Sequence, residues 1–469
     1  MNGLLKGLMS GSVAGALLLA PPAAAATVTQ ADVQALRDQI AELNTKIGDL
    51  RRSMANQTSG AGHNADVHVS LDRGRLSFAS PEGDFSASLR ALVQYDYAYY
   101  GQGKAPAGID LSSGGNFRRA QIGLVGSVFR DWSYNLTFDF GGTGTEKSGY
   151  IYTAYIEYDG LKPFGARIGA YAPPAGLEDS TGSADLIFLE RPASSDVARN
   201  IAGAPSRDSV TVFAQGNTYL AALSYTGGKV GDSAVFDEQQ ALVGRLADLA
   251  YTDNDTQILL DADASYVFKL ADNAPGPGSP TSASLSIGPE LAVDGSKLIN
   301  TGTIDASRVG EFGGEAAAEW RSLFLQGGYF HFDIVRRTGA LPNPQFDGWY
   351  ALVAWTLTGE RRKYDPETAS FRQPRPDAPL GSKGGMGAWE LAARFSELDL
   401  NDHPELSAAA GGVRGGKQDV WSLAVNWYPN AAIRFALDFE NITVARLSSA
   451  GADIGVDANA VALRAQLAL

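Results

Sequence analysis

Strict alternation of apolar and polar side chains from Phe117 to Gly142 is the feature that most restricts how this chain can fold. The alternation pauses at Arg130 and Asp131, which form a tight turn, and then resumes. Its apolar positions are Ala120, Ile122, Leu124, Gly126, Val128, Trp132, Tyr134, Leu136, Phe138 and Phe140. Successive side chains of a strand point to opposite faces, so the pattern predicts an antiparallel hairpin. Either a water-soluble sandwich or a membrane barrel, with lipid on its apolar face and water on its polar face, would produce it.

Composition favours the barrel. Hydrophobic residues make up 44% of the 469 residues, yet beyond the first residues there is no apolar run long enough for a spanning helix. A barrel explains this combination, because alternation dilutes the apolar residues of its membrane face. The chain has no Cys, which fits an oxidising compartment. We therefore expect an all-β fold, a transmembrane antiparallel β-barrel.

Residues 1–26 have the pattern of a secretory signal peptide. Lys6 is their only charge, Leu17–Leu19 form the apolar centre, and Ala24–Ala26 offer a small-residue cleavage site. A short N-terminal anchor helix is the alternative. The formal net charge of −14 argues against nucleic-acid binding, which requires a basic face. We expect export to the outer membrane of a Gram-negative bacterium.

Residues 29–55 follow a different period and predict a short periplasmic coiled-coil helix. Its heptad seam consists of Val33, Leu36, Ile40, Leu43, Ile47, Leu50 and Met54. Three heptads are marginal for an isolated helix, so the seam requires a partner. That partner is either other copies of the chain or, alternatively, its own barrel or the peptidoglycan. Residues 56–84 are predicted to be a polar linker followed by short strands.

Alternation continues through residues 85–469, the predicted barrel. Outer-membrane barrels have short periplasmic turns and long external loops, which fixes the direction of each strand. The predicted strands are 85–99, 117–128, 132–140, 150–159, 165–172, 209–216, 218–226, 239–247, 256–270, 309–320, 323–335, 346–358, 387–398, 417–428, 432–446 and 457–469. With both ends periplasmic the count is even, so residues 271–308 contribute no spanning strand or two. We prefer sixteen strands over eighteen.

Several stretches resemble the phosphate-selective porin O and P family, and they occur in the order of that family. They are residues 117–141, 173–191, 346–366, 387–402 and 421–440. The resemblance implies a sixteen-stranded, trimeric outer-membrane barrel through which anions diffuse, in some members phosphate or polyphosphate. It also places Arg118 and Arg119 at the position of an arginine pair. The chain departs from outer-membrane proteins in ending on Leu469, where an aromatic residue is common.

Residues 173–208 are predicted to form the longest early external loop, and long loops of this kind are usually functional. In porins the loop after the fifth strand folds into the lumen and narrows it. Glu178 and Glu190 lie in this loop. We expect them to anchor it to arginines of the barrel wall; alternatively, they form a charged ring at the constriction.

A diffusion channel selects its solutes by its width and by the charge at its constriction. Arginine suits phosphate because its planar guanidinium forms bidentate, charge-assisted hydrogen bonds. Alternation places Arg119 in the lumen but Arg118 at the lipid interface, unless the strand begins after Arg118. The candidate pore-lining arginines are Arg90, Arg118, Arg119, Arg167, Arg191, Arg199, Arg207, Arg245, Arg394, Arg434 and Arg464. Alternatively, these arginines pair with acids predicted to face inward, which are Asp96, Asp139, Glu157, Asp261, Asp263, Glu390, Asp438 and Glu440.

Motifs for other chemistry are weak. Residues 141–149 resemble a phosphate-binding loop but lie between strands and carry Glu146 in place of a glycine. No cofactor, metal site or catalytic residue is expected, and Asp399, Asn401 and Glu405 are better explained as a solvated loop than as a calcium site. The sequence therefore predicts an outer-membrane porin, a passive diffusion channel for small anionic or neutral hydrophilic solutes, surrounded by outer-membrane lipid.

Two other functions remain as alternatives. One is an envelope tether, in which the helix 29–55 binds the cell wall and the pore is incidental. The other is an outer-membrane hydrolase that uses a serine with His331 or His403.

Overall fold

The computed structural model describes Glu42, Thr45, Lys46 and residues 67–469, apart from residues 73, 107–108, 232–236 and 277. The predicted signal peptide, the rest of the predicted helix 29–55 and the linker up to residue 66 lie outside the described residues. Glu42 and Lys46 are helical and form an ion pair of 2.8 Å, one turn apart. The chain divides into two compact units, Met1–Ala65 and Asp66–Leu469.

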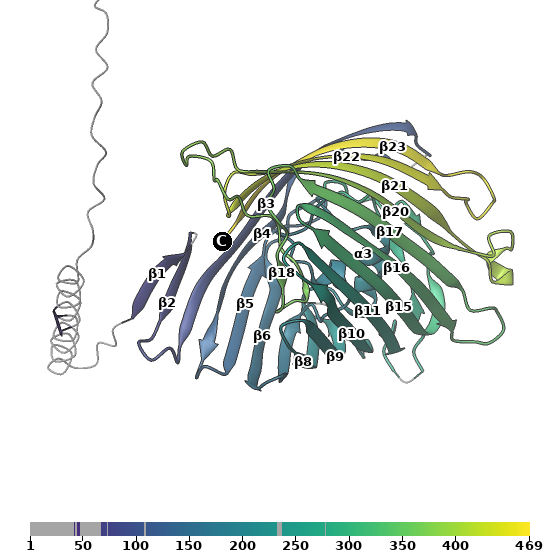
Figure 1. Ribbon diagram of the computed structural model, residues 1–469. Coiled ribbons are helices and arrows are strands. Elements are labelled where there is room, and N and C mark those ends of the chain that lie inside the picture. The colour runs from purple at the N-terminus through teal and green to yellow at the C-terminus, as the bar shows by residue number, and fades with distance from the viewer. Residues whose placement is uncertain are drawn as a thin grey trace, which may run out of the picture. The chain divides into compact units, whose positions relative to one another are not determined.

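Sixteen antiparallel strands form a closed barrel in the second unit (Figure 1). They are β3 (Ser86–Lys104), β4 (Gly114–Val128), β5 (Trp132–Asp139), β6 (Tyr150–Leu161), β7 (Phe164–Tyr171), β8 (Arg207–Gln215), β9 (Tyr219–Lys229), β10 (Gln240–Thr252), β11 (Thr256–Lys269), β15 (Ile304–Trp320), β16 (Leu323–Arg336), β17 (Gln345–Thr356), β20 (Ala388–Asp402), β21 (Val413–Tyr428), β22 (Ile433–Ala445) and β23 (Val456–Ala468). Each strand pairs with the next, and β23 pairs with β3, which closes the sheet. Closure leaves the barrel without an exposed edge. The predicted strand count is confirmed.

Residues 271–308 contain three short strands and no additional spanning strand, so the eighteen-strand alternative is wrong. β12 (Ser282–Ala283), β13 (Ser286–Ile287) and β14 (Ile299–Asn300) have two residues each. Two residues cover far less than the roughly nine to eleven that a tilted strand needs to cross a bilayer.

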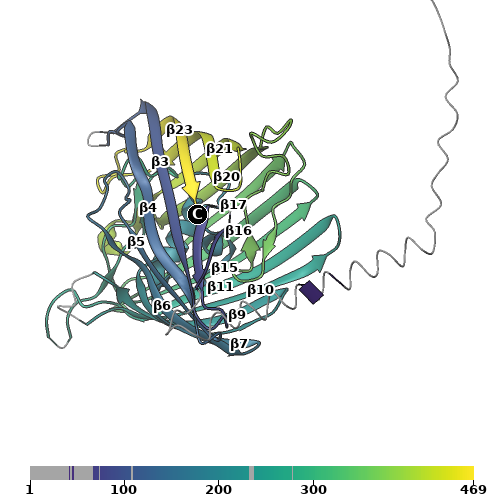
Figure 2. The same ribbon diagram turned by 90° about the vertical axis from the view of Figure 1, so that its left-hand side faces the viewer.

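A hairpin of β1 (His68–Asp72) and β2 (Arg75–Ala79) precedes the barrel. β2 pairs with Ser86–Ser88 at the start of β3. On the same strand, Ala91 exchanges backbone hydrogen bonds with Leu469. The hairpin therefore extends the sheet where the last strand ends (Figure 2).

Three connecting segments fold into the barrel. Residues 172–206 carry α2 (Leu177–Ser180) and α3 (Ala193–Ala202), and residues 270–303 follow β11. Both connect strands at the external edge. Residues 357–387, which carry β18 (Tyr364–Asp365) and β19 (Ser370–Phe371), connect β17 to β20 at the opposite edge, where the chain ends. This segment breaks the rule of short periplasmic turns. No helix among the described residues is long and apolar enough to cross a membrane.

The inserted segments create an apolar core inside the barrel. Helix α3 packs against β15, β16, β17 and β20. Lumen-facing side chains of these strands are buried beneath it; among them are Phe330, Phe332, Ile334 and Phe346. The expectation of a polar inner face is therefore wrong for this sector, because the inserted segments and not water cover it.

Candidate functional site in the barrel lumen

A β-bulge at Arg118 turns two neighbouring arginines towards the lumen. Arg119 pairs with Gln94 of β3 and Phe117 pairs with Tyr95, so Arg118 has no partner in the register. A bulge places two residues opposite one and shifts the alternation beyond it. Arg118 is hydrogen bonded to Glu190 inside the barrel at 2.8 and 3.0 Å. The prediction that Arg118 faces lipid is therefore wrong.

Glu190 is the common partner of three wall arginines. Besides Arg118, its carboxylate contacts Arg464 at 3.0 Å and Arg119 at 3.4 Å. Burial alone would raise the pKa of Glu190, but the three guanidinium groups outweigh it and hold that pKa well below its usual range. Arg464 also forms a bidentate pair with Asp96. One loop carboxylate thus joins β4 to β23.

Side chains of the wall, together with Arg362 of the segment 357–387, bind almost every carbonyl of residues 183–190. Arg434 donates to the carbonyls of Leu186 and Ile187, and Arg394 donates to the carbonyl of Glu190 at 2.8 Å. The remaining donor–carbonyl pairs are Gln94–Ser183, Gln466–Ala184, Arg362–Asp185, Asn426–Ile187 and Arg464–Leu189. Residues 183–190 form a turn and bends and belong to no helix or strand, so their buried carbonyls need donors from elsewhere in the chain. Arg394 and Arg434 therefore hold the loop, a role that alternation did not predict.

Other predicted arginines are already paired with acids. The pairs are Arg167–Glu157, Arg199–Asp179, Arg245–Asp261 and Arg394–Glu290. Arg207 donates to the backbone carbonyls of Gly203 and Gly227. Arg90 is half-buried on the lumen face of β3 and makes no hydrogen bond or ion pair with the described residues.

The loop residue Glu178 contacts a neutral side chain of the wall. Its carboxylate accepts a hydrogen bond from Gln326 at 2.6 Å, and its backbone N–H donates to Glu315. Burial raises the pKa of Glu178, against the attraction of Arg191. Glu178 therefore lies on the opposite side of the loop from the arginines that bind Glu190.

Alternation did not predict the contribution of residues 357–387. Arg362 pairs with Glu390 at 2.8 and 2.9 Å, and Arg361 pairs with Glu319. The backbone N–H of Gln373 donates to the carboxylate of Asp185. Asp185 belongs to the segment 172–206, called here the constriction loop. The length of this connection, on the side where the direction rule expects a short turn, was the available signal.

Cationic side chains surround a cavity of about 350 Å³ beside the constriction loop. They are Arg118, Arg119, Lys147, Arg191, Arg199 and Lys229. Asp139 is the one carboxylate among the lining residues, and it accepts hydrogen bonds from Gln121 and from backbone N–H groups. Glu190, Asp179 and Asp196 also pair with arginines of this lining, so six positive charges meet four negative ones. The cavity, called here the basic cavity, therefore has a local excess of positive charge.

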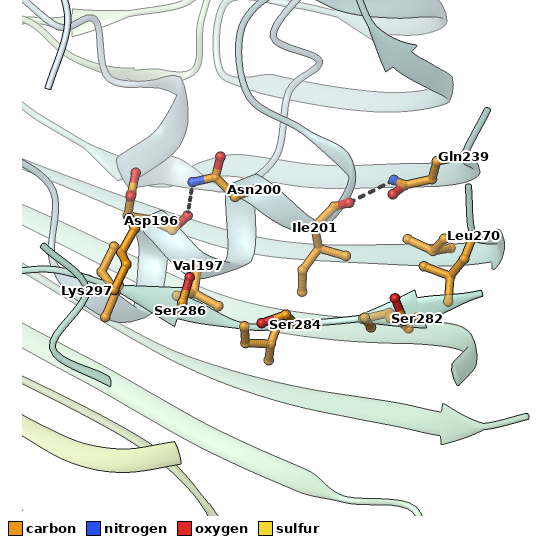
Figure 3. Close-up of a pocket in the computed structure, with 15 residues that line it drawn as sticks. Asp196, Val197, Asn200, Ile201, Gln239, Leu270, Ser282, Ser284, Ser286 and Lys297 are labelled. Atoms are coloured by element: carbon orange, nitrogen blue, oxygen red, sulfur yellow. Dashed lines mark hydrogen bonds between the residues drawn. The ribbon is translucent and has the colours of Figure 1, made fainter. Parts of the chain in front are cut away.

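A second cavity, of about 390 Å³, lies between α3 and the segment 270–303 (Figure 3). Ser282, Ser284 and Ser286 line one side of it, with Asp196 and Lys297 at one end. Its charges balance and its other polar groups are neutral. This cavity has no charge preference comparable to that of the basic cavity.

The two histidines proposed for hydrolysis are paired with acids. His331 contacts Asp347 at 2.7 Å, and His403 contacts Glu405 at 3.3 Å in an external turn. Neither has a serine hydroxyl among its hydrogen-bond partners in the described part of the chain. Among the described residues, neither histidine therefore contacts the serine nucleophile that such a reaction needs.

The family model of phosphate-selective porin O and P matches residues 85–469. The chain belongs to this family. Porin O of Pseudomonas aeruginosa is 26% identical over 417 residues, which cover 83% of this chain and 90% of that protein. An uncharacterised protein of Caulobacter vibrioides is 27% identical over 387 residues, which cover 78% of this chain and 70% of that protein.

Solved structures share the fold. An anion-selective porin from Comamonas acidovorans has a TM-score of 0.50 at 12% identity, and the match covers 82% of this chain and all of that one. The outer-membrane protein OmpT of Vibrio cholerae also reaches 0.50, at 9% identity, covering 82% of this chain and 98% of that one. Together with family membership, the barrel makes the protein an outer-membrane porin, a channel and not an enzyme.

Proposed function

We propose that this porin passes small anions, inorganic phosphate among them, through the basic cavity. One observation carries the proposal: six cationic side chains line the cavity, against one carboxylate in the lining and three, Glu190, Asp179 and Asp196, that pair with lining arginines. A passive channel prefers the ion whose charge is opposite to that of its narrow part. Guanidinium groups add bidentate hydrogen bonds that suit phosphate oxygens.

The local pairing supports an uncompensated positive charge. Arg118, Arg119 and Arg464 share the carboxylate of Glu190. Arg191 is bound by the backbone carbonyls of Glu178, Asp179 and Thr181, which fix its position without cancelling its charge. Arg191 is therefore the side chain that we assign to the solute path.

Replacing Arg191 with glutamine is expected to weaken block of chloride current by phosphate about tenfold, the value of one lost charge-assisted hydrogen bond. Single-channel recording of the purified porin, with increasing phosphate, measures this. Arg191→Lys keeps the charge and is expected to retain most of the block, whereas Arg321→Gln, in an exposed turn, is the matched control. Equal block in Arg191→Gln and the unaltered porin would contradict the proposed path.

The barrel wall supports a further proposal, a homotrimer. β5 and β7 have eight residues each, below the roughly nine to eleven needed to cross a bilayer. Their sector has exposed apolar residues, among them Ile168 and Val212. The strands of this sector are too short to match the thickness of the bilayer. A neighbouring subunit, in place of lipid, would cover their exposed apolar side chains.

We further propose that the predicted periplasmic helix 29–55 supports assembly through its heptad seam. The porin purified in mild detergent is expected to sediment as three chains, and deletion of 29–55 to lower the temperature at which these separate. Sedimentation as a single chain would contradict the trimer. Unchanged trimer stability without the helix would instead favour the envelope tether, which stays a prediction.

A further inference from the structure

Three carboxylates meet inside the barrel on the wall formed by β11 and β15. Asp261, Asp263 and Glu315 each bring an oxygen to within 4.8 Å of the other two, and all three are buried. The strand register places Asp261 opposite Glu315 and Asp263 opposite Gly313. Alternation turns all of these positions towards the lumen.

Buried oxygens of this cluster have no hydrogen-bond donor in the described chain. They are Oδ1 of Asp261 and Oδ1 of Asp263. Asp263 is 6% exposed and has no ion pair with the described residues. The neighbouring Glu311, 4% exposed, lies within hydrogen-bonding reach of Asp263 and Ser265. Burying an acceptor without a hydrogen-bond donor costs free energy of folding. A partner outside the described chain would remove this cost.

The charges of the cluster do not balance. Arg245 neutralises Asp261, with 2.8 Å between Nε and Oδ2. Glu315 accepts hydrogen bonds from Tyr350 and from the backbone N–H of Leu177, at 2.6 and 2.5 Å. When ionised, Asp263 and Glu315 carry two negative charges, and no cationic side chain of the described residues forms an ion pair with either.

Two glycines lie directly against these oxygens. A Cβ at Gly313 would lie 2.5 Å from Oδ1 of Asp263. A Cβ at Gly176, at the start of helix α2, would lie 2.6 Å from Oε2 of Glu315. Side chains at these positions would collide with the carboxylates, so only glycine allows the carboxylates to lie where they do.

We propose that Asp261, Asp263 and Glu315 bind one divalent cation, with Glu311 beside it, and that calcium is the ion they suit. Carboxylate oxygens are the ligands of hard cations, and calcium tolerates irregular sets of them. A charge of two matches the imbalance of the cluster. Since Glu315 also holds Leu177 and Glu178, the ion would fix the constriction loop to the wall opposite Glu190.

Terbium luminescence of the full-length porin in detergent tests this proposal. Terbium replaces calcium in oxygen sites, and Tyr350, hydrogen bonded to Glu315, lies close enough to sensitise its emission. After treatment with chelator, the porin is expected to bind one terbium per chain at neutral pH and to release it to calcium. Asp263→Asn is expected to lower the affinity at least about tenfold, because ligand charge sets calcium affinity.

Glu319→Gln is the matched control, since it removes one lumen-facing acid from the same strand, where Arg361 pairs with it. It should bind as the unaltered porin does. Heat-dependent electrophoretic mobility checks that each variant is folded, and Tyr350→Phe should lose the sensitised emission while calcium binding persists in calorimetry. Absence of binding to the unaltered porin would overturn the proposal and indicate that a proton, shared with Glu311, neutralises Asp263. Equal binding by Asp263→Asn would overturn it as well.

Discussion

Replacing Arg434 with methionine is expected to release the constriction loop and to increase single-channel conductance. The Arg434 side chain is fully buried and donates to the carbonyls of Leu186 and Ile187 and to Asn426. Methionine has a similar volume but no donor, so three buried acceptors lose a partner. The carbonyl of Ile187 still accepts from Asn426, so two acceptors are left unsatisfied. At about 1–3 kcal/mol for each, the loss is on the order of 2 kcal/mol or more.

Two measurements check this result: conductance in planar bilayers and the temperature of the heat-dependent mobility shift. Arg130→Met is the matched control, because Arg130 is 65% exposed in a turn and pairs with Asp84 at the surface. Such exposed pairs contribute little. Unchanged conductance and melting in Arg434→Met would show that the carbonyl contacts do not hold the loop.

Replacing Glu190 with glutamine is expected to have the second large effect. The change leaves Arg118, Arg119 and Arg464 without their shared carboxylate. Removing one partner of a buried ion pair costs about 3–5 kcal/mol. The same change raises the positive charge beside the basic cavity, so anion preference is expected to increase while stability falls. Glu405→Gln, an exposed acid of an external turn, controls for the loss of one negative charge.

The pH dependence of the Glu190 ion pairs follows from the direction in which the pKa of Glu190 is shifted. The pKa of Glu190 is lowered in the folded protein. A lowered pKa stabilises the fold above the unfolded value, about 4.3 for glutamate, and the effect is lost as the pH falls through the folded value. The contribution of Glu190 to stability and selectivity should therefore stay constant between neutral pH and about pH 5. A difference between Glu190→Gln and the unaltered porin that disappears within this interval would contradict the assigned pairing.

The strands could be predicted because one property repeats along the chain. Each spanning strand alternates apolar and polar residues, and short turns such as Arg321-Ser322 fix the direction of their neighbours. Closure then requires an even count. Sixteen strands follow from these local rules, without knowledge of which residues touch.

Contacts inside the lumen could not be predicted in the same way. Alternation assumes a regular strand, so the bulge at Arg118 changes the face of that residue without a sequence signal. Arginines such as Arg394 and Arg434 were expected to face solute, because an inward direction does not reveal an inserted loop. Residues 357–387 enter from the opposite mouth, and only their length distinguished them from an ordinary turn.

We propose that positive charge at the basic cavity makes this porin select anions. The reversal potential of the purified porin in a planar bilayer, under a gradient of KCl, tests it most directly. We expect a reversal potential of the sign that preferential chloride permeation gives. We expect the reversal potential of Arg191→Gln to be smaller in magnitude, because that variant lacks one positive charge of the cavity. A reversal potential of the opposite sign, given by preferential potassium permeation, would contradict the proposed anion selectivity.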